Sequence, residues 1–273
     1  MSALPSSSPF PQALAACADL WRGDELGAAD GPARPTGHAA LDAQLPGGGW
    51  PVGTLTELLQ PAPDAPVWPL LLPALAAAVA ERQAPVVLVG PPHEPFGPAL
   101  AGAGLPVQAL LWVRAETAAE RLWACEQALR CAGVAAVLAW LPQARAAELR
   151  RLQLAAARHA ALLFVLRPEA DREGASPARL RLRVAPSEGR PDQLDVQVLK
   201  RRGPPMAAPL ALPARSAHMA ALLAAAGRRR RMAVPDAASA GGGATVLRLD
   251  PRRPRRTGFQ EAGHALAGAV VAA

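Results

Sequence analysis

The sequence contains no tyrosine, and aromatic residues make up only 4% of it although hydrophobic residues make up 51%. The core must therefore be built from alanine, leucine and valine, which favours close-packed helices and short buried strands. The three cysteines, Cys17, Cys125 and Cys131, cannot all pair with one another, which argues against a disulfide-stabilised secreted domain. The chain also begins without the charged and then apolar stretch of a secretory signal. We therefore expect a cytoplasmic protein.

Long hydrophobic runs are missing as well. The longest, Val67 to Ala80, is too short to span a membrane and is interrupted by Pro69 and Pro73. It predicts a buried helix or a strand-to-helix connection. At 273 residues the chain can bury one sizeable core and still leave length for an arm or a tail.

Lysine is almost absent, since Lys200 is the only one and the other 28 of the 29 basic residues are arginine. We attribute the arginine excess, which accompanies many alanines and prolines, to base composition. The formal net charge is +7. Residues 228–256 hold nine arginines and two acids, which leaves a local net charge of +7, so the remaining residues sum to zero. The basic character therefore belongs to the C-terminal tail.

The stretch from Thr36 to Gln60 reads as the entrance to a nucleotide-binding sheet. Pro46-Gly47-Gly48-Gly49 break a short helix, and Thr54 to Leu59 alternate β-favouring and polar residues as a strand does. In a P-loop protein such a strand leads into G-x-x-x-x-G-K-[ST], whose backbone N–H groups, lysine and hydroxyl hold the phosphates and magnesium. The entrance segment predicts that such a loop, if present, begins at Gln60.

The loop that follows reads Gln60-Pro61-Ala62-Pro63-Asp64-Ala65-Pro66-Val67. Pro66 falls at the position of the lysine and Val67 at that of the hydroxyl, so no cation meets the phosphates and no side-chain oxygen meets the metal. The prolines also remove backbone donors from a phosphate cradle. We predict that this degenerate loop binds neither nucleotide nor metal. The alternative is an ordinary proline-rich turn without nucleotide-binding ancestry.

Downstream, short apolar runs alternate with helical patterns, which predicts a right-handed α/β fold with a mainly parallel sheet. We expect buried strands at Pro85–Gly90, Leu110–Val113, Val134–Trp140 and Ala161–Leu166, and helices at Leu70–Gln83, Phe96–Gly104, Thr117–Ala132 and Ala144–Ala160.

After the fourth strand the pattern changes. A charged loop at Pro168–Pro177 precedes Arg179–Val184, whose period-two alternation predicts a half-exposed antiparallel strand. A loop at Ala185–Gln193 then leads to a second strand at Asp195–Leu199, so we expect a C-terminal hairpin that Lys200-Arg201-Arg202 closes.

The composition divides the chain into three parts. Residues 1–35 form an N-terminal arm, with a disordered start to Pro11, a helix from Pro11 to Trp21 and a linker. Residues 36–205 form the core. Residues 206–273 hold a helix at Ser216–Ala226 and a basic, largely disordered tail.

This order of elements resembles the RecA-type ATPase core. Within that superfamily the chain resembles the ImuA family between about Trp21 and Pro205. The resemblance rests on Trp21-Arg22-Gly23, Thr36-Gly37, Leu41-Asp42, Leu45-Pro46-Gly47-Gly48-Gly49-Trp50-Pro51 and Leu55-Thr56-Glu57-Leu58-Leu59. It implies an SOS-induced accessory protein of DNA-damage mutagenesis that works with ImuB, a polymerase-like protein lacking catalysis, and with an error-prone DnaE-type polymerase. DNA and RecA are further partners to consider.

RecA chemistry does not carry over to the positions that match. Gly90-Pro91-Pro92-His93 lies where RecA has its catalytic glutamate, and Glu94 is one residue away. Val137 to Trp140 lies where a Walker B aspartate would end the strand. We therefore expect a protein that is not an enzyme and holds no cofactor or metal. An active ATPase with an unrecognised loop is the rival, and another is a division inhibitor, since SulA proteins also resemble shortened RecA relatives.

The candidate contacts with a partner or DNA are Trp21 and Arg22 in the arm, Lys200, Arg201 and Arg202 at the end of the hairpin, and Arg228, Arg229, Arg230 and Arg231 in the tail. The hairpin cluster suits an acidic partner surface or a DNA backbone, or else is a solvated turn. The tail cluster suits phosphates, or else is a solvated helix end favoured by the helix dipole. Cys125 and Cys131 are expected to be buried thiols, and no histidine lies beside them at ligand spacing.

Overall fold

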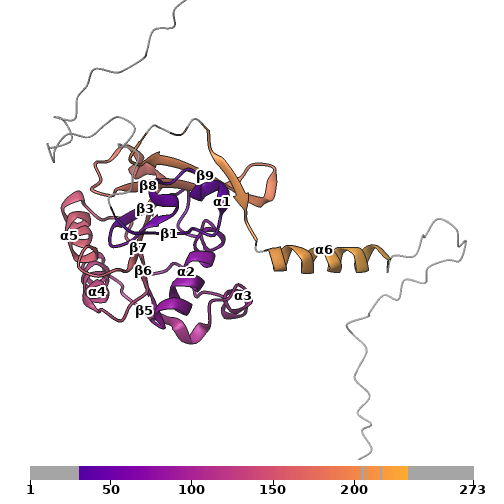
Figure 1. The fold of residues 1–273 in the computed structure, drawn as a ribbon, viewed down its shortest axis with the longest axis horizontal. Helices are drawn as coiled ribbons and strands as arrows, with labels where there is room; N and C mark the ends of the chain where they lie inside the picture. Colours follow the sequence, from indigo (N-terminus) through magenta and orange to yellow (C-terminus); the bar gives the residue numbers. More distant parts are fainter. Residues whose placement is uncertain (1–30, 204–205, 207, 216, 233–273) are drawn as a thin grey trace, which may run out of the picture. The chain divides into compact units, whose positions relative to one another are not determined.

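We describe a computed structural model of the protein that covers residues 31–203, 206, 208–215 and 217–232 (Figure 1). The predicted disordered start, the predicted helix from Pro11 to Trp21 and the tail beyond residue 232 lie outside the described residues.

The core is an eight-stranded sheet in the order β10-β9-β8-β3-β7-β6-β4-β5. Its strands are β3 (Leu55–Gln60), β4 (Val86–Val89), β5 (Leu110–Val113), β6 (Ala136–Trp140), β7 (Leu162–Pro168), β8 (Leu180–Ser187), β9 (Arg190–Lys200) and β10 (Leu210–Pro213). The strands from β8 to β5 in this order are parallel, whereas β9 is antiparallel to both β8 and β10. The prediction of an α/β fold with a mainly parallel sheet and an antiparallel hairpin is confirmed.

Helices cover both faces of the sheet, with α4 and α5 on one side and α2 and α3 on the other (Figure 1). They are α2 (Trp68–Arg82), α3 (Gly97–Gly102), α4 (Ala118–Arg130) and α5 (Ala146–Ala156). Leu71 of α2 packs in the cluster that holds Phe164, and Leu149 of α5 packs in the cluster that holds Val165. Because neighbouring residues of a strand point to opposite faces, β7 contributes to both halves of the core. The described part of the C-terminal region also holds α6 (Ala217–Met232).

The entrance segment forms its own small layer. It contains α1 (Ala39–Asp42), a 3₁₀ turn η3 (Pro46–Gly48) and the short pair β1 (Ala33–Arg34) and β2 (Trp50–Pro51). Trp50 is fully buried and meets Phe164 edge-to-face at 5.2 Å between ring centroids. A Cβ on Gly49 would lie 2.1 Å from the carbonyl oxygen of Arg34, so only glycine permits this approach of the two strands. Trp50 therefore anchors the entrance segment in the core, and Gly49 allows β1 and β2 to lie close together.

Two predictions about the strands were wrong, and one strand was not predicted. Leu110–Val113 forms the edge strand β5 and is not buried on both faces, because Leu111 is 50% exposed. The predicted loop Ala185–Gln193 is mostly strand, since β8 and β9 are joined by a tight turn at Glu188 and Gly189. The strand β10 was not predicted, and it extends the sheet beyond residue 205. These three differences concern the length of the strands and their places in the sheet, which the periodicity of apolar residues does not determine.

One further prediction failed, because the burial of a strand depends on its neighbours. The strand at Arg179–Val184 was expected to be half exposed, but Arg181 on β8 is buried, since β8 pairs in parallel with β3. The six residues of β3 are all buried as well, although Thr54–Leu59 alternates in polarity.

A buried ion-pair triad joins the three central strands. Glu57 on β3 is completely buried and forms ion pairs with Arg167 on β7, at 2.6 Å, and with Arg181 on β8, at 2.5 Å. Arg181 also donates to the carbonyl oxygens of Asp171, Arg172 and Gly174. These bonds tie the 3₁₀ turn η5 (Glu169–Glu173), in the segment predicted as a charged loop, to the middle of the sheet.

Candidate functional site: a basic cavity at the amino end of the sheet

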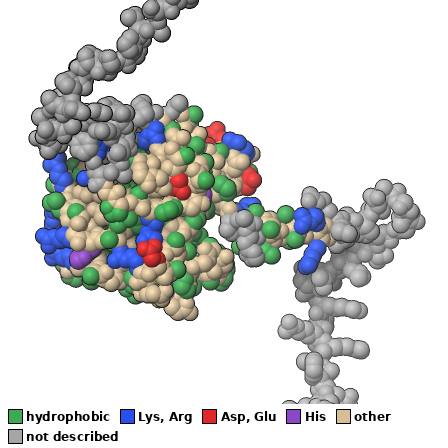
Figure 2. Space-filling model, in the orientation of Figure 1, with side chains coloured by type: hydrophobic (Ala, Val, Ile, Leu, Met, Phe, Trp, Pro, Cys, Tyr) green, Lys and Arg blue, Asp and Glu red, His purple; other side chains and the backbone are tan. Residues whose placement is uncertain are grey.

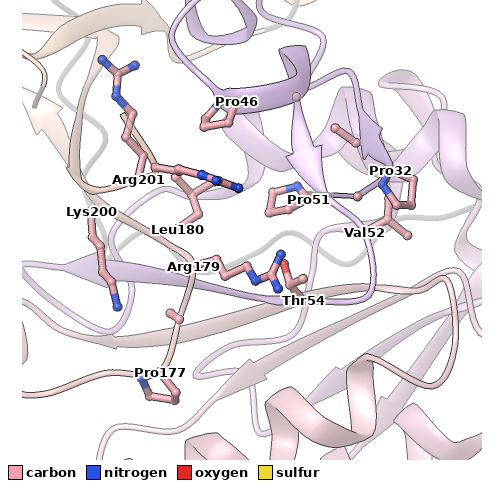
Figure 3. Close-up of a pocket in the computed structure, with 15 residues that line it drawn as sticks. Pro32, Pro46, Pro51, Val52, Thr54, Pro177, Arg179, Leu180, Lys200 and Arg201 are labelled. Carbon is pink, nitrogen blue, oxygen red and sulfur yellow. The ribbon is translucent and has the colours of Figure 1, made fainter. Parts of the chain in front are cut away.

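A cavity of about 370 Å³ opens at the amino ends of the central strands (Figure 3). One wall comes from the entrance segment and the other from the start of β8 and the end of β9. The lining residues are Gly31, Pro32, Ala33, Pro46, Gly49, Pro51, Val52, Thr54, Pro177, Ala178, Arg179, Leu180, Lys200, Arg201 and Arg202. We call it the basic cavity. Two stretches that the sequence singled out, the Pro-Gly-Gly-Gly entrance and Lys200-Arg201-Arg202, thus meet although about 150 residues separate them.

The strand pairing explains how the cations reach the cavity. Lys200 ends β9 and pairs with Arg181 at the start of β8, and Arg179 immediately precedes β8. Because β8 runs parallel to β3, the start of β8 lies beside the start of β3 at Thr54. The four cations that line the cavity therefore lie at the end of the sheet where the entrance segment leads into β3. They are Arg179, Lys200, Arg201 and Arg202.

The contacts of the cations differ. The Lys200 ammonium donates to the carbonyl oxygen of Ser176 at 3.0 Å, and Arg201 donates to the backbone carbonyl of Gln44. Arg179 is exposed and forms no hydrogen bond or ion pair with the described residues. In Figure 3 its guanidinium reaches toward Thr54. Arg179 and Lys200 thus present charge at an open surface, while Arg201 also fastens the entrance segment.

The basic cavity combines positive charge with apolar walls. None of its described lining residues is a carboxylate, a histidine or a cysteine. Four cations beside four prolines and Val52 suit an acidic ligand that also carries apolar groups. Proline walls are rigid, so ordering them on binding costs little conformational entropy.

The degenerate loop lies at the opposite end of β3, roughly 20 Å away along six strand residues. The amide of Gln60 donates to the carbonyl oxygen of Ala65 at 2.7 Å and closes the loop on itself. Pro66 is exposed, whereas Val67 is 2% exposed and packs in the core at the start of α2. The residue that the sequence analysis compared with the P-loop hydroxyl is thus a core side chain.

A second cavity, of about 350 Å³, lies at this carboxyl end. The loops after β3 and β4, at Gln60–Pro63 and Gly90–Pro92, border it together with Trp140, Arg121 and Arg167. No carboxylate stands among its described lining residues, and Arg167 is already paired with Glu57. Glu94 borders an adjoining hollow with Asp64 and His93. Across residues 31–232, as far as they are described, no group of three or more His, Cys, Asp and Glu is placed to hold a metal ion.

Several sequence candidates cannot be placed in a site. Trp21 and Arg22 lie outside the described residues. Arg228 and Arg229 are exposed on α6, and the side chains of Arg230 and Arg231 are outside the described part. Among the helices that are described, none combines the length and the apolar character needed to cross a bilayer.

Sequence reasoning missed a basic face on α5. Lys and Arg side chains gather there in Figure 2, at the left of the view. Arg150, Arg151 and Arg158 are exposed, and Leu154 between them is 70% exposed. Arg150 and Leu154, four residues apart, lie on one stripe of the helix, whereas Arg158 lies in the turn after the helix ends at Ala156. The spacing by four was the available signal.

The two cysteines on and after α4 differ, so the prediction that both are buried was half wrong. Cys125 is buried, and burial raises the pKa of its thiol to about 12. Cys131 is exposed just after the helix ends. The helix ends at Arg130, one residue before Cys131, and the spacing of apolar residues does not indicate where a helix ends.

The fold and the cavity define an α/β protein whose central strand carries a loop without phosphate-binding side chains at one end and a basic binding surface at the other. No protein-family profile matches the chain. The chain is 32% identical over 192 residues to the ImuA proteins of two Caulobacter vibrioides strains, NA1000 / CB15N and ATCC 19089, and the match covers 64% of this chain and 75% of theirs. It is 34% identical over 104 residues to the cell division inhibitor SulA of Edwardsiella piscicida, covering 38% of this chain and 62% of that one. The chain belongs to the ImuA family.

Proposed function

We propose that the chain is a non-catalytic, RecA-like accessory protein of error-prone translesion DNA synthesis. It binds an ImuB-like, polymerase-related protein and supports a DnaE-type polymerase. The two Caulobacter relatives named ImuA support the assignment to this process.

The observation that carries the proposal is the loop between β3 and α2. It occupies the strand-to-helix position of a phosphate-binding loop, yet it offers Pro66 in place of a lysine and the buried Val67 in place of a hydroxyl. Phosphoryl transfer depends on positioned cations and a metal at this point. A RecA-like core with this loop is suited to holding partners and not to hydrolysing nucleotide.

The basic cavity is the surface we assign to the polymerase-related partner. Its cations and proline walls suit an acidic, partly apolar segment of that partner. The α5 face and the arginines of the tail are assigned to DNA, whose phosphates attract guanidinium groups without reading sequence.

Binding of the purified full chain to its ImuB partner, with and without ATP, tests this function. We expect nucleotide-independent binding that Lys200→Glu weakens about two- to fivefold, as for an exposed charge pair. Arg150→Glu on α5 is the matched control and should leave this binding unchanged. Absence of binding under all conditions, or a strict need for ATP, would contradict the proposal.

The similarity to SulA over 104 residues supports a second candidate, a cell-division inhibitor that binds the division GTPase. Affinity purification from DNA-damaged cells separates the two. Recovery of polymerase components supports the accessory function, whereas recovery of the division protein alone favours the inhibitor.

A further inference from the structure

The residues just before the basic cavity carry charge of the opposite sign. Residues 17–30 contain four acids and one arginine, which gives a net charge of −3 in a chain whose total is +7. The acids are Asp19, Asp24, Glu25 and Asp30, and the arginine is Arg22. The same segment carries the apolar side chains of Leu20, Trp21 and Leu26. It therefore carries acidic and apolar groups within a few residues, which match the cations and the apolar walls of the cavity.

The chain enters the cavity directly from this segment. Gly31, Pro32 and Ala33 line the cavity, so Asp30 is covalently next to its wall. Asp24 is seven residues from Gly31 and can lie up to about 23 Å from it along an extended chain. That reach exceeds the width of a cavity of about 370 Å³, so each acidic side chain from Asp24 to Asp30 can reach a cation of the cavity.

We propose that residues 19–30 dock in the basic cavity of their own chain. The acidic side chains face Arg179 and Lys200, and Trp21 or Leu26 packs on the proline walls. A tethered segment of this length has an effective concentration in the millimolar range, so weak contacts are enough to fill the cavity. The docked segment occupies the same surface that is assigned above to the partner. The docking itself does not depend on that function.

Tryptic cleavage after Arg22 in the full chain, without any partner, measures the docking. Docking shields this bond, and cleavage follows the undocked population when docking is fast. We expect Arg179→Glu to release the fragment 1–22 about two- to fivefold faster, since it removes one exposed charge pair, and added salt to act in the same direction. Arg150→Glu is the matched control on α5 and should leave the rate unchanged. Equal rates for Arg179→Glu and the parent chain would overturn the proposal.

A photo-crosslinker, benzoylphenylalanine in place of Leu26, locates the segment. We expect cross-links to residues 46–54 or 177–202 of the same chain, and a lower yield of these cross-links in the Arg179→Glu background. Mixing isotopically light and heavy chains identifies the partner of each cross-link. Cross-links between two chains would overturn the intrachain docking and assign the cavity to a second copy, and cross-links elsewhere on the core would overturn it altogether. Neither readout involves ImuB, so failure here is distinct from failure of the proposed function.

Discussion

Replacement of Glu57 by glutamine should destabilise the fold strongly, because the Glu57 carboxylate pairs with two buried guanidinium groups in the middle of the sheet, whereas Asp171 pairs with Arg167 alone. The side chains of Glu57, Arg167 and Arg181 are 0%, 8% and 9% exposed. Glutamine keeps the size of the side chain and one acceptor oxygen but removes the charge, so Arg181 loses its ion pair and Arg167 keeps only the one with the partly exposed Asp171. Breaking a buried ion pair from one side costs about 3–5 kcal/mol. The ratio of folded to unfolded chains should therefore fall by a factor between roughly 10² and 4 × 10³.

Urea unfolding followed by far-ultraviolet circular dichroism and by tryptophan fluorescence measures this loss. With a slope of about 2–3 kcal/mol per molar urea, the midpoint should fall by about 1–2 M. Coincidence of the two probes is the condition for converting midpoints into free energies. Glu188→Gln, at the exposed turn between β8 and β9, is the matched control and should leave the midpoint unchanged.

The triad also predicts the outcome of a compensating change. Replacing all three members by apolar residues, Glu57→Leu with Arg167→Met and Arg181→Met, removes both the buried charges and their desolvation cost, so most of the lost stability should return. A midpoint shift below about 0.3 M for Glu57→Gln would refute the reasoning. A triple variant as unstable as Glu57→Gln would show that the bonds from Arg181 to the turn η5 carry the stability instead.

Three further results are expected. Gly49→Ala should cost about 1–3 kcal/mol in urea unfolding, because its Cβ would lie 2.1 Å from the carbonyl oxygen of Arg34; an unchanged midpoint would contradict this packing. Backbone N–H groups before α4 lower the pKa of Glu120 below its ordinary value of 4.5, so its stabilising effect is present above that value and is lost as the pH falls below it. The thermal midpoint of Glu120→Gln should thus lie below that of the parent chain at pH 7 and converge with it in acid. Cys131 should react with iodoacetamide at pH 8 before unfolding, whereas only about one in 10⁴ of the Cys125 thiols is ionised there and that site should stay unlabelled in peptide mass spectra.

The sequence by itself determined the class of the fold and the place of the degenerate loop. Runs such as Val86–Val89 are apolar on both faces, and this pattern occurs where helices cover both sides of a parallel sheet. The loop after β3 could be located because a strand, a proline-rich turn and a helix follow one another directly in the chain. The resemblance to ImuA, carried by the Pro-Gly-Gly-Gly entrance, was also available from the sequence and is confirmed by the Caulobacter relatives.

Only the tertiary structure decided which strands are neighbours and what those neighbours bring together. The polarity of Glu57 and Arg181 predicts exposure, yet both are buried, because β8 pairs with β3 and places the opposite charges in contact. The basic cavity arises in the same way, since the end of β9 meets the entrance segment from which it is separated by about 150 residues. Periodicity reports the two faces of one strand, whereas pairing across the sheet depends on contacts between distant segments. For that reason Lys200 could be singled out from the sequence as a candidate contact, while Arg179 beside it could not.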